Sequence, residues 1–229
     1  MQTIPVAHLA LSFIPAAVVV AYMFRTRRGA KTSLYALSRM VLQLVLIGYV
    51  LIYIFESRQP LIVLGVLGVM MAAASFIALR TVAPQRRALF GKALGSIVLG
   101  GGGTLILVTQ GVLRIDPWYD PSVVIPLGGM IFAASMNAIA LAAERREAEE
   151  KLGKSDDEAI ADAFHTALIP IMNSLFAVGL VTLPGMMTGQ ILSGVSPLIA
   201  ARYQIMVMAM IFGATGLSAL LFLYFSRKR

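Results

Sequence analysis

The stretch from Leu183 to Pro197, Leu-Pro-Gly-Met-Met-Thr-Gly-Gln-Ile-Leu-Ser-Gly-Val-Ser-Pro, decides the fold, because it interrupts an apolar helix without supplying a polar loop. Proline has no amide donor and glycine tolerates conformations that other residues avoid, so Leu183-Pro184-Gly185 predicts the end of a helix. The residues after this break are too apolar for an ordinary loop and too few to cross a bilayer. Irregular backbone at membrane depth needs protein or a water-filled cavity to satisfy its polar groups. We therefore expect this segment to line or plug a passage.

The composition around this stretch indicates an integral membrane protein. Of the 229 residues, 59% are hydrophobic and 13% are charged, and the mean hydropathy is +0.84, which is outside the range of soluble domains. The expected fold is all-α, a polytopic membrane protein of about seven transmembrane helices in one domain over residues 1–229. The seven stretches that are long and apolar enough to span are Ile4–Phe24, Met40–Phe55 extended back toward Leu34, Leu61–Leu79, Ala93–Leu113, Val123–Ala143, Ala167–Leu183 and Tyr203–Phe225.

The basic residues indicate how these helices are oriented. Alternate loops carry 16 of the 19 Lys and Arg residues, and the opposite loops hold only Arg58, Arg114 and Arg202. The first apolar stretch lacks the basic flank and cleavage site of a signal peptide, so we expect it to be retained. The positive-inside rule then predicts a protein of the plasma (inner) membrane with its N-terminus outside and its C-terminus in the cytosol. The net charge of +8 favours anionic lipid headgroups, and its division among short loops argues against nucleic-acid binding.

The sequence contains no motif that would supply energy for transport or catalyse a reaction. There is no G-x-x-x-x-G-K-[ST] phosphate loop, and no carboxylate or histidine lies well inside a span to relay protons. The glycines from Gly100 to Gly103 lack a following lysine and are expected to serve close helix packing or a flexible kink. The chain has no cysteine, and no nucleophile, base and metal-ligand cluster can be assembled, so we do not expect an enzyme or a bound cofactor. Energy, if used, must come from a partner.

The cytosolic segment of about residues 144–163 is the expected docking site for such a partner. A charged helix begins at Glu144, a break falls at Gly153, and Ser155 has the sequence signature of an N-cap that opens a second helix. A short helix along the membrane face could bind an ATP-binding subunit. The simpler alternative is a solvated connector that is stabilised by Glu–Lys and Glu–Arg pairs. The candidate coupling residues are Gly153, Ser155, Asp156, Asp157, Glu158 and Ala159.

A few polar residues and methionines within the spans are candidates for the pathway. Polar side chains within a membrane span face the protein interior. They more often form hydrogen bonds between helices than hydrogen bonds to a substrate. Most of the 13 methionines are expected to fill the core, with soft-metal binding as the alternative for Met186-Met187. His8 and His165 are expected near opposite faces and share no metal. The candidate pathway and gate residues are Pro184, Gly185, Met186, Met187, Thr188, Gln190, Asn137, Asn173, Ser174, Gln204 and Gln43.

Three blocks of sequence resemble the permease subunit of the Fet-type iron-export ABC transporters, a family that also includes plant aluminium-tolerance permeases. They are Arg39–Phe55, the Val-Ile-Pro-Leu-Gly-Gly-Met of Val124–Met130, and Ala167–Pro170 continuing through Leu-Pro-Gly-Met-Met-Thr-Gly at Leu183–Gly189 to Tyr203–Met206. The resemblance implies a homodimeric permease that exports iron or another metal ion. It also implies a separate subunit that binds ATP with magnesium and contacts the cytosolic segment.

The sequence departs from this family pattern at two places within the spans. Ala133-Ala134 stands where the family typically has Gly-Asn, and Phe176-Ala177 stands where it has Lys-Thr. Polar groups at membrane depth are thus replaced at Ala134, Phe176 and Ala177. If those groups handle the transported species, the cargo differs here or the chain belongs to a divergent branch with reduced activity. A passive channel or a membrane scaffold, which needs no coupling segment and would tolerate loss of residues 147–158, is the alternative function.

Overall fold

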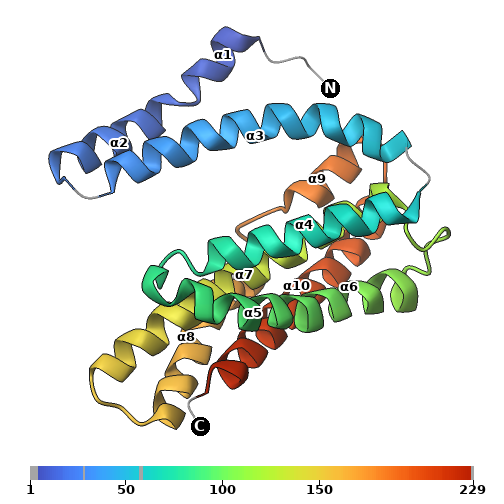
Figure 1. The fold of residues 1–229 in the computed structure, drawn as a ribbon. Helices are drawn as coiled ribbons and strands as arrows, with labels where there is room; N and C mark the ends of the chain where they lie inside the picture. The colour runs from blue at the N-terminus through green and yellow to red at the C-terminus, as the bar shows by residue number, and fades with distance from the viewer. Residues whose placement is uncertain (1–4, 28, 57–58, 228–229) are drawn as a thin grey trace. The chain divides into compact units, whose positions relative to one another are not determined.

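All regular elements in the described part of the chain are helices (Figure 1). The computed structural model describes residues 5–27, 29–56 and 59–227. The chain divides into two compact units, Met1–Ser57 and Arg58–Arg229, and each is considered by itself. Within the described residues six helices are long and apolar enough to cross a membrane. The expected all-α, polytopic architecture is therefore confirmed.

The first unit contains α1 (Val6–Leu11), α2 (Ile14–Arg25) and α3 (Ala30–Glu56). The first expected span, whose Ile4 lies outside the described residues, is not one continuous helix. It divides at Ser12, whose hydroxyl donates to the Leu9 carbonyl at 2.7 Å, and α2 begins with Pro15 in its first turn, where a missing amide donor costs nothing. The α2 helix has only 12 residues, so among the described residues of this unit only α3 is long enough to span.

The second unit contains the other five long helices. Its elements are α4 (Pro60–Ala78), η1 (Ala83–Gln85), α5 (Arg86–Ser96), η2 (Ile97–Gly102), α6 (Gly103–Ile106), η3 (Leu107–Val112), α7 (Pro121–Lys151), α8 (Asp156–Ala177), α9 (Gly185–Leu192) and α10 (Pro197–Ser226). The elements from η1 to η3 form one continuous span over Ala83–Val112. Both η2 and η3 are π-helical, which means that each turn holds more residues than an α-helical turn.

The core of the second unit forms where α7 packs against α4, α8 and α10. At its centre the Ser218 hydroxyl donates to Ser135 Oγ at 3.0 Å, so two buried polar groups satisfy each other across helices. A side-chain carbon at Gly100 would lie 2.8 Å from the Ser218 backbone nitrogen. Only glycine therefore lets η2 and α10 approach this closely, as expected for Gly100.

The interruption before α9 differs from the prediction. The α8 helix ends at Ala177 rather than at Leu183, because Gly179 takes a positive φ of +85° that turns the chain. The Val181 and Thr182 amides both donate to the Ala177 carbonyl, at 2.8 and 3.1 Å. Pro184 is the N-cap of α9 instead of a helix terminator. Proline is favoured at a helix start, where the first amides have no intrahelical acceptor in any case.

Candidate functional site

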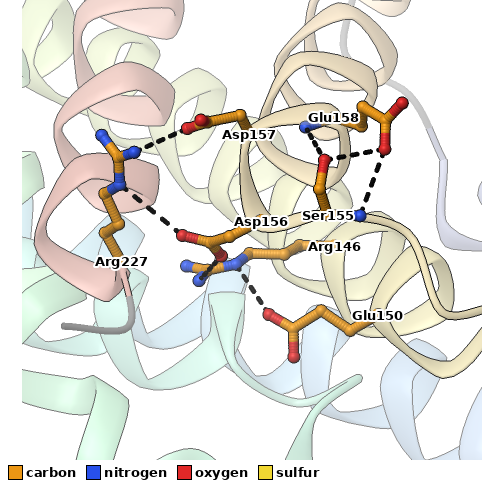
Figure 2. A network of polar contacts seen from close by, with 7 residues as sticks. All are labelled: Arg146, Glu150, Ser155, Asp156, Asp157, Glu158 and Arg227. Atoms are coloured by element: carbon orange, nitrogen blue, oxygen red, sulfur yellow. Dashed lines mark hydrogen bonds and ion pairs between the residues drawn. The ribbon is translucent and has the colours of Figure 1, made fainter.

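An ion-paired cluster joins α7, the turn after it, the start of α8 and the end of α10 (Figure 2). Its centre is Arg146, which is only 6% exposed. The Arg146 guanidinium donates to Asp156 Oδ1 at 2.6 Å and to Glu150 Oε1 at 3.0 Å. A buried guanidinium requires such partners, since an unpaired charge out of water is costly. We call these residues, together with Arg227 and Asp157, the corner cluster.

Arg227 extends the corner cluster to the end of α10. Its guanidinium donates to Asp157 Oδ1 at 2.7 Å and lies 3.7 Å from Asp156 Oδ2. Asp156 is thus shared by two arginines that belong to different parts of the bundle (Figure 2). These pairs fix the position of the α7–α8 turn relative to α10.

A second set of ion pairs supports the same turn. Glu149 is fully buried and pairs with Arg145 and with Lys154, the latter at 2.8 Å. Lys154 also pairs with Asp162 at 2.6 Å. These contacts, first with Asp162 and then with Glu149, raise the pKa of the Lys154 ammonium above its ordinary value. The two carboxylates thus favour the charged form of Lys154.

The expected helix start at Ser155 is confirmed. The Ser155 hydroxyl accepts from the Glu158 amide at 3.4 Å, and Glu158 Oε2 accepts from the Ser155 amide at 3.2 Å, which is a complete capping box (Figure 2). The predicted break at Gly153 is also present, with a φ of +80°. Both features follow from local residue chemistry, which explains why the sequence revealed them.

The candidate coupling residues are engaged within the protein more than sequence reasoning expected. The carboxylates of Asp156, Asp157 and Glu158 all have internal partners, and Ala159 is fully buried. Leu152, at the apex of the turn, is instead 75% exposed. The sequence reasoning missed Arg146, Arg227 and Leu152. Helical spacing of Arg146 and Glu150 was a usable signal, whereas nothing local pointed to Arg227, which is 70 residues from Asp157.

A hollow of ≈ 200 Å³ lies where α7, α8 and α10 meet, and it collects two candidate pathway residues. Asn137 and Ser174 line it together with Thr215 and Ala134. Thr215 is 3% exposed and its hydroxyl has no hydrogen-bond partner. The Ser174 hydroxyl donates to the Pro170 carbonyl at 2.9 Å. Ala134, one of the apolar replacements, therefore borders a hollow that three polar side chains also line.

Another hollow, of ≈ 440 Å³, lies where the end of α8, α9 and α10 meet. It collects the candidates Met187 and Gln204, and it is also lined by Met208. The sequence placed Met208 among the methionines expected to fill the core. Its position one helical turn beyond Gln204 was the signal for a shared face.

The remaining candidates line neither hollow. Asn173 is exposed, and Gln43 is exposed on α3 in the first unit. Thr188 donates its hydroxyl to the Pro184 carbonyl at 3.2 Å, one turn back in α9. Gln190 has a buried side-chain oxygen without a hydrogen-bond partner. Pro184, Gly185 and Met186 begin α9 without lining either hollow.

No cluster of acidic and histidine ligands supports a conventional metal site in the described ranges. Groups of three or more His, Cys, Asp or Glu residues that could hold a metal ion are absent there. The polar groups that reach the hollows are amides and hydroxyls, with thioethers beside them. Any ligand held in these hollows would be bound by neutral groups.

The helices, the two hollows and the corner cluster define a multi-pass α-helical membrane protein with neutral polar groups inside its bundle. The chain belongs to the family described as Uncharacterised protein family (UPF0014), whose model matches residues 6–229. This membership agrees with the family resemblance found in the sequence.

Named relatives of this family match most of the chain. The UPF0014 membrane protein slr1647 of Synechocystis sp. is 39% identical over 204 residues, covering 82% of this chain and 78% of the relative. The protein named "Probable iron export permease protein FetB" of Escherichia coli is 33% identical over 242 residues, covering 96% and 89%. The UPF0014 membrane protein STAR2 of Oryza sativa is 30% identical over 224 residues, covering 91% and 77%. No solved structure is significantly similar to this chain.

Proposed function

We propose that this chain is the permease subunit of an ABC transporter that exports iron or another metal ion, driven by ATP and magnesium bound in a separate subunit. The name of the Escherichia coli relative supports permeation and a metal cargo. The observation that carries the proposal is the corner cluster, which holds the α7–α8 turn by ion pairs to α10. A turn that must transmit force between subunits has to be rigidly connected to the helices it moves.

The partner contact is Leu152 and the residues beside it, rather than the carboxylates of the corner cluster. Leu152 is exposed in a charged surrounding, where an apolar side chain gains most from being covered by a second protein. Asp156 and Asp157 orient the turn through Arg146 and Arg227. The candidate coupling residues from Gly153 to Glu158 thus act as the support for this contact.

The transported species is proposed to pass the hollows bordered by α8 and α10. The two hollows contain four of the eleven candidate pathway residues, Asn137, Ser174, Met187 and Gln204. We propose further that the chain forms a homodimer in the plasma (inner) membrane, with the corner cluster in the cytosol. Alternation of the six long helices would place the basic connections after α2, α4, α7 and α10 on one side, which supports this orientation.

Co-expression and co-purification with a candidate ATP-binding subunit test the proposal. Leu152→Asp should abolish co-purification and the stimulation of ATP hydrolysis, because a carboxylate cannot be buried in an apolar contact. Leu180→Asp is the matched control, since Leu180 is also highly exposed but lies in the loop at the other end of α8. Normal assembly of the Leu152 variant would place the contact elsewhere. Full export without residues 147–158 would favour a passive channel.

A further inference from the structure

The hollow bordered by α9 and α10 brings together two thioethers and one amide from separate parts of the chain. Gln204 and Met208 are four residues apart on α10, so they share one face of that helix. Met187 reaches the same hollow from the first turn of α9. The loop residues Val178 and Gly179 complete this side of it. The positive φ of Gly179 and the helix start at Pro184 bring Met187 to this place.

Gln204 has no partner for its side-chain oxygen, although the residue is only 6% exposed. A buried carbonyl oxygen without a hydrogen bond is unfavourable, and most such atoms in folded proteins have a partner. Gln204 itself lines the hollow, so a cation bound there beside this residue would supply the partner that its buried oxygen lacks.

The remaining lining determines which cation fits. No carboxylate, histidine or basic side chain is among the lining residues, which are otherwise Leu, Ile, Ala, Val and Gly. Removing an ion from water costs more as its charge rises, and nothing in this lining offsets two positive charges. Thioethers are soft ligands that select soft metals such as copper(I), whereas hard divalent ions prefer carboxylates and water.

We propose that this hollow binds a soft monovalent metal ion, copper(I) or silver(I), through the sulfur atoms of Met187 and Met208 and the side-chain oxygen of Gln204. The binding itself does not depend on the transport function proposed above. A role of this site in binding the transported ion does rest on that proposal. In that role, the site would make the preferred cargo a soft ion rather than ferrous iron.

Calorimetric titration of the purified full-length protein with silver(I), in chloride-free buffer, tests the site. We expect one tight site in the unaltered protein and at least a tenfold loss of affinity in Met187→Leu with Met208→Leu. Leucine keeps the volume and apolarity of methionine but removes the sulfur. Met186→Leu with Met206→Leu is the matched control, because both residues are half-buried neighbours in the same helices but do not line the hollow. The control pair should bind silver(I) like the unaltered protein.

Gln204 is tested separately, and X-ray absorption keeps the proposal testable if a variant misfolds. Gln204→Leu should weaken binding, whereas Gln204→Met, which adds a third thioether, should retain it. The absorption spectrum of silver bound to the unaltered protein should show sulfur neighbours. Equal affinity in the Met187 and Met208 pair variant, tighter binding of ferrous iron, or a spectrum without sulfur would each overturn the inference. If silver(I) binds as expected but no ATP-binding subunit co-purifies with the chain, the site stands and the transport proposal fails.

Discussion

Single residues in this protein are most constrained where helices touch without side chains between them. Gly100 and Gly102 belong to the same π-helical segment, yet an added methyl group would meet Ser218 at Gly100 and nothing within 4 Å at Gly102. The sequence showed four consecutive glycines and predicted close packing or a flexible kink for all of them. Which glycine makes the contact depends on the rotation of the helix against α10, and π-helical turns alter that rotation.

Gly100→Ala should therefore destabilise the protein by about 1–3 kcal/mol, because the new methyl group collides with backbone that cannot move aside. Gly102→Ala should leave stability unchanged or slightly raised, since alanine favours a helix. Thermal unfolding of both variants in detergent measures the difference. Equal melting temperatures would mean that η2 and α10 are further apart than described.

Arg146 is the residue on which the corner cluster depends. Arg146→Gln should cost about 2–4 kcal/mol, since it removes a buried charge from its partners and leaves Glu150 and Asp156 undercompensated. Lys151→Ala, which breaks an exposed pair with Glu147 on the same helix, should cost less than about 0.5 kcal/mol. Comparison of the two melting temperatures decides whether the cluster is structural. A similar small loss in both variants would show that it is not.

At the scale of elements, capping residues predicted where α8 begins, whereas the apolar run misplaced where it ends. Ser155 and Glu158 form the expected capping box, and the break at Gly153 is where the sequence indicated it. The end of α8 was placed six residues too late, at Leu183, because the apolar run continues past the turn at Gly179. Hydropathy does not distinguish an apolar helix from an apolar loop. The positive φ of Gly179 ends the helix, and the sequence alone does not show which glycine adopts a positive φ.

Gly179→Ala should consequently destabilise the loop before α9 by about 1 kcal/mol, because alanine disfavours a positive φ. Gly189→Ala, in the middle of α9 with nothing within 4 Å, should slow amide exchange there instead. Hydrogen exchange measured by mass spectrometry over residues 178–192 reports both effects. Pro184→Ala with Gly185→Ala should not join α8 to α9, since the turn lies before both residues. If that double variant abolishes export while α9 stays in place, the segment still acts as a gate.

At the scale of the whole molecule, composition was sufficient to predict the class of protein but not the contacts between distant residues. Apolar runs located all six long helices of the described residues, but only for α4 do both predicted bounds lie within one residue of those observed. The corner cluster joins Arg227 to Asp157, 70 positions away, and the core contact of Ser135 with Ser218 spans 83 positions. Periodicity along one helix contains no information about such distant partners. The candidate pathway residues were therefore predicted without their grouping, and the structure places four of them in two hollows and the others outside both.

The proposed orientation can be tested because the chain has no cysteine, so each introduced thiol is unique. Single cysteines at Gln59 and Ser193 should react with an impermeant reagent on intact cells, whereas those at Gln85 and Gly153 should not. A cysteine at Thr3, outside the described residues, reports on the divided first segment. Labelling at Thr3 is expected if α1 and α2 together cross the bilayer. Labelling at Gln85 or Gly153 would invert the orientation.

The π-helical segments η2 and η3 have a consequence for how this span tolerates changes in length. Each packs additional residues into its turns, so loss of one residue from Leu107–Val112 can be absorbed by a return to α-helical winding. Residues on either side of the deletion would then keep their orientation toward the neighbouring helices. The same deletion within α7 would rotate everything beyond it by about 100° and move its buried face toward lipid. Insertions and deletions among relatives should accordingly collect in the span of Ala83–Val112 and avoid α7.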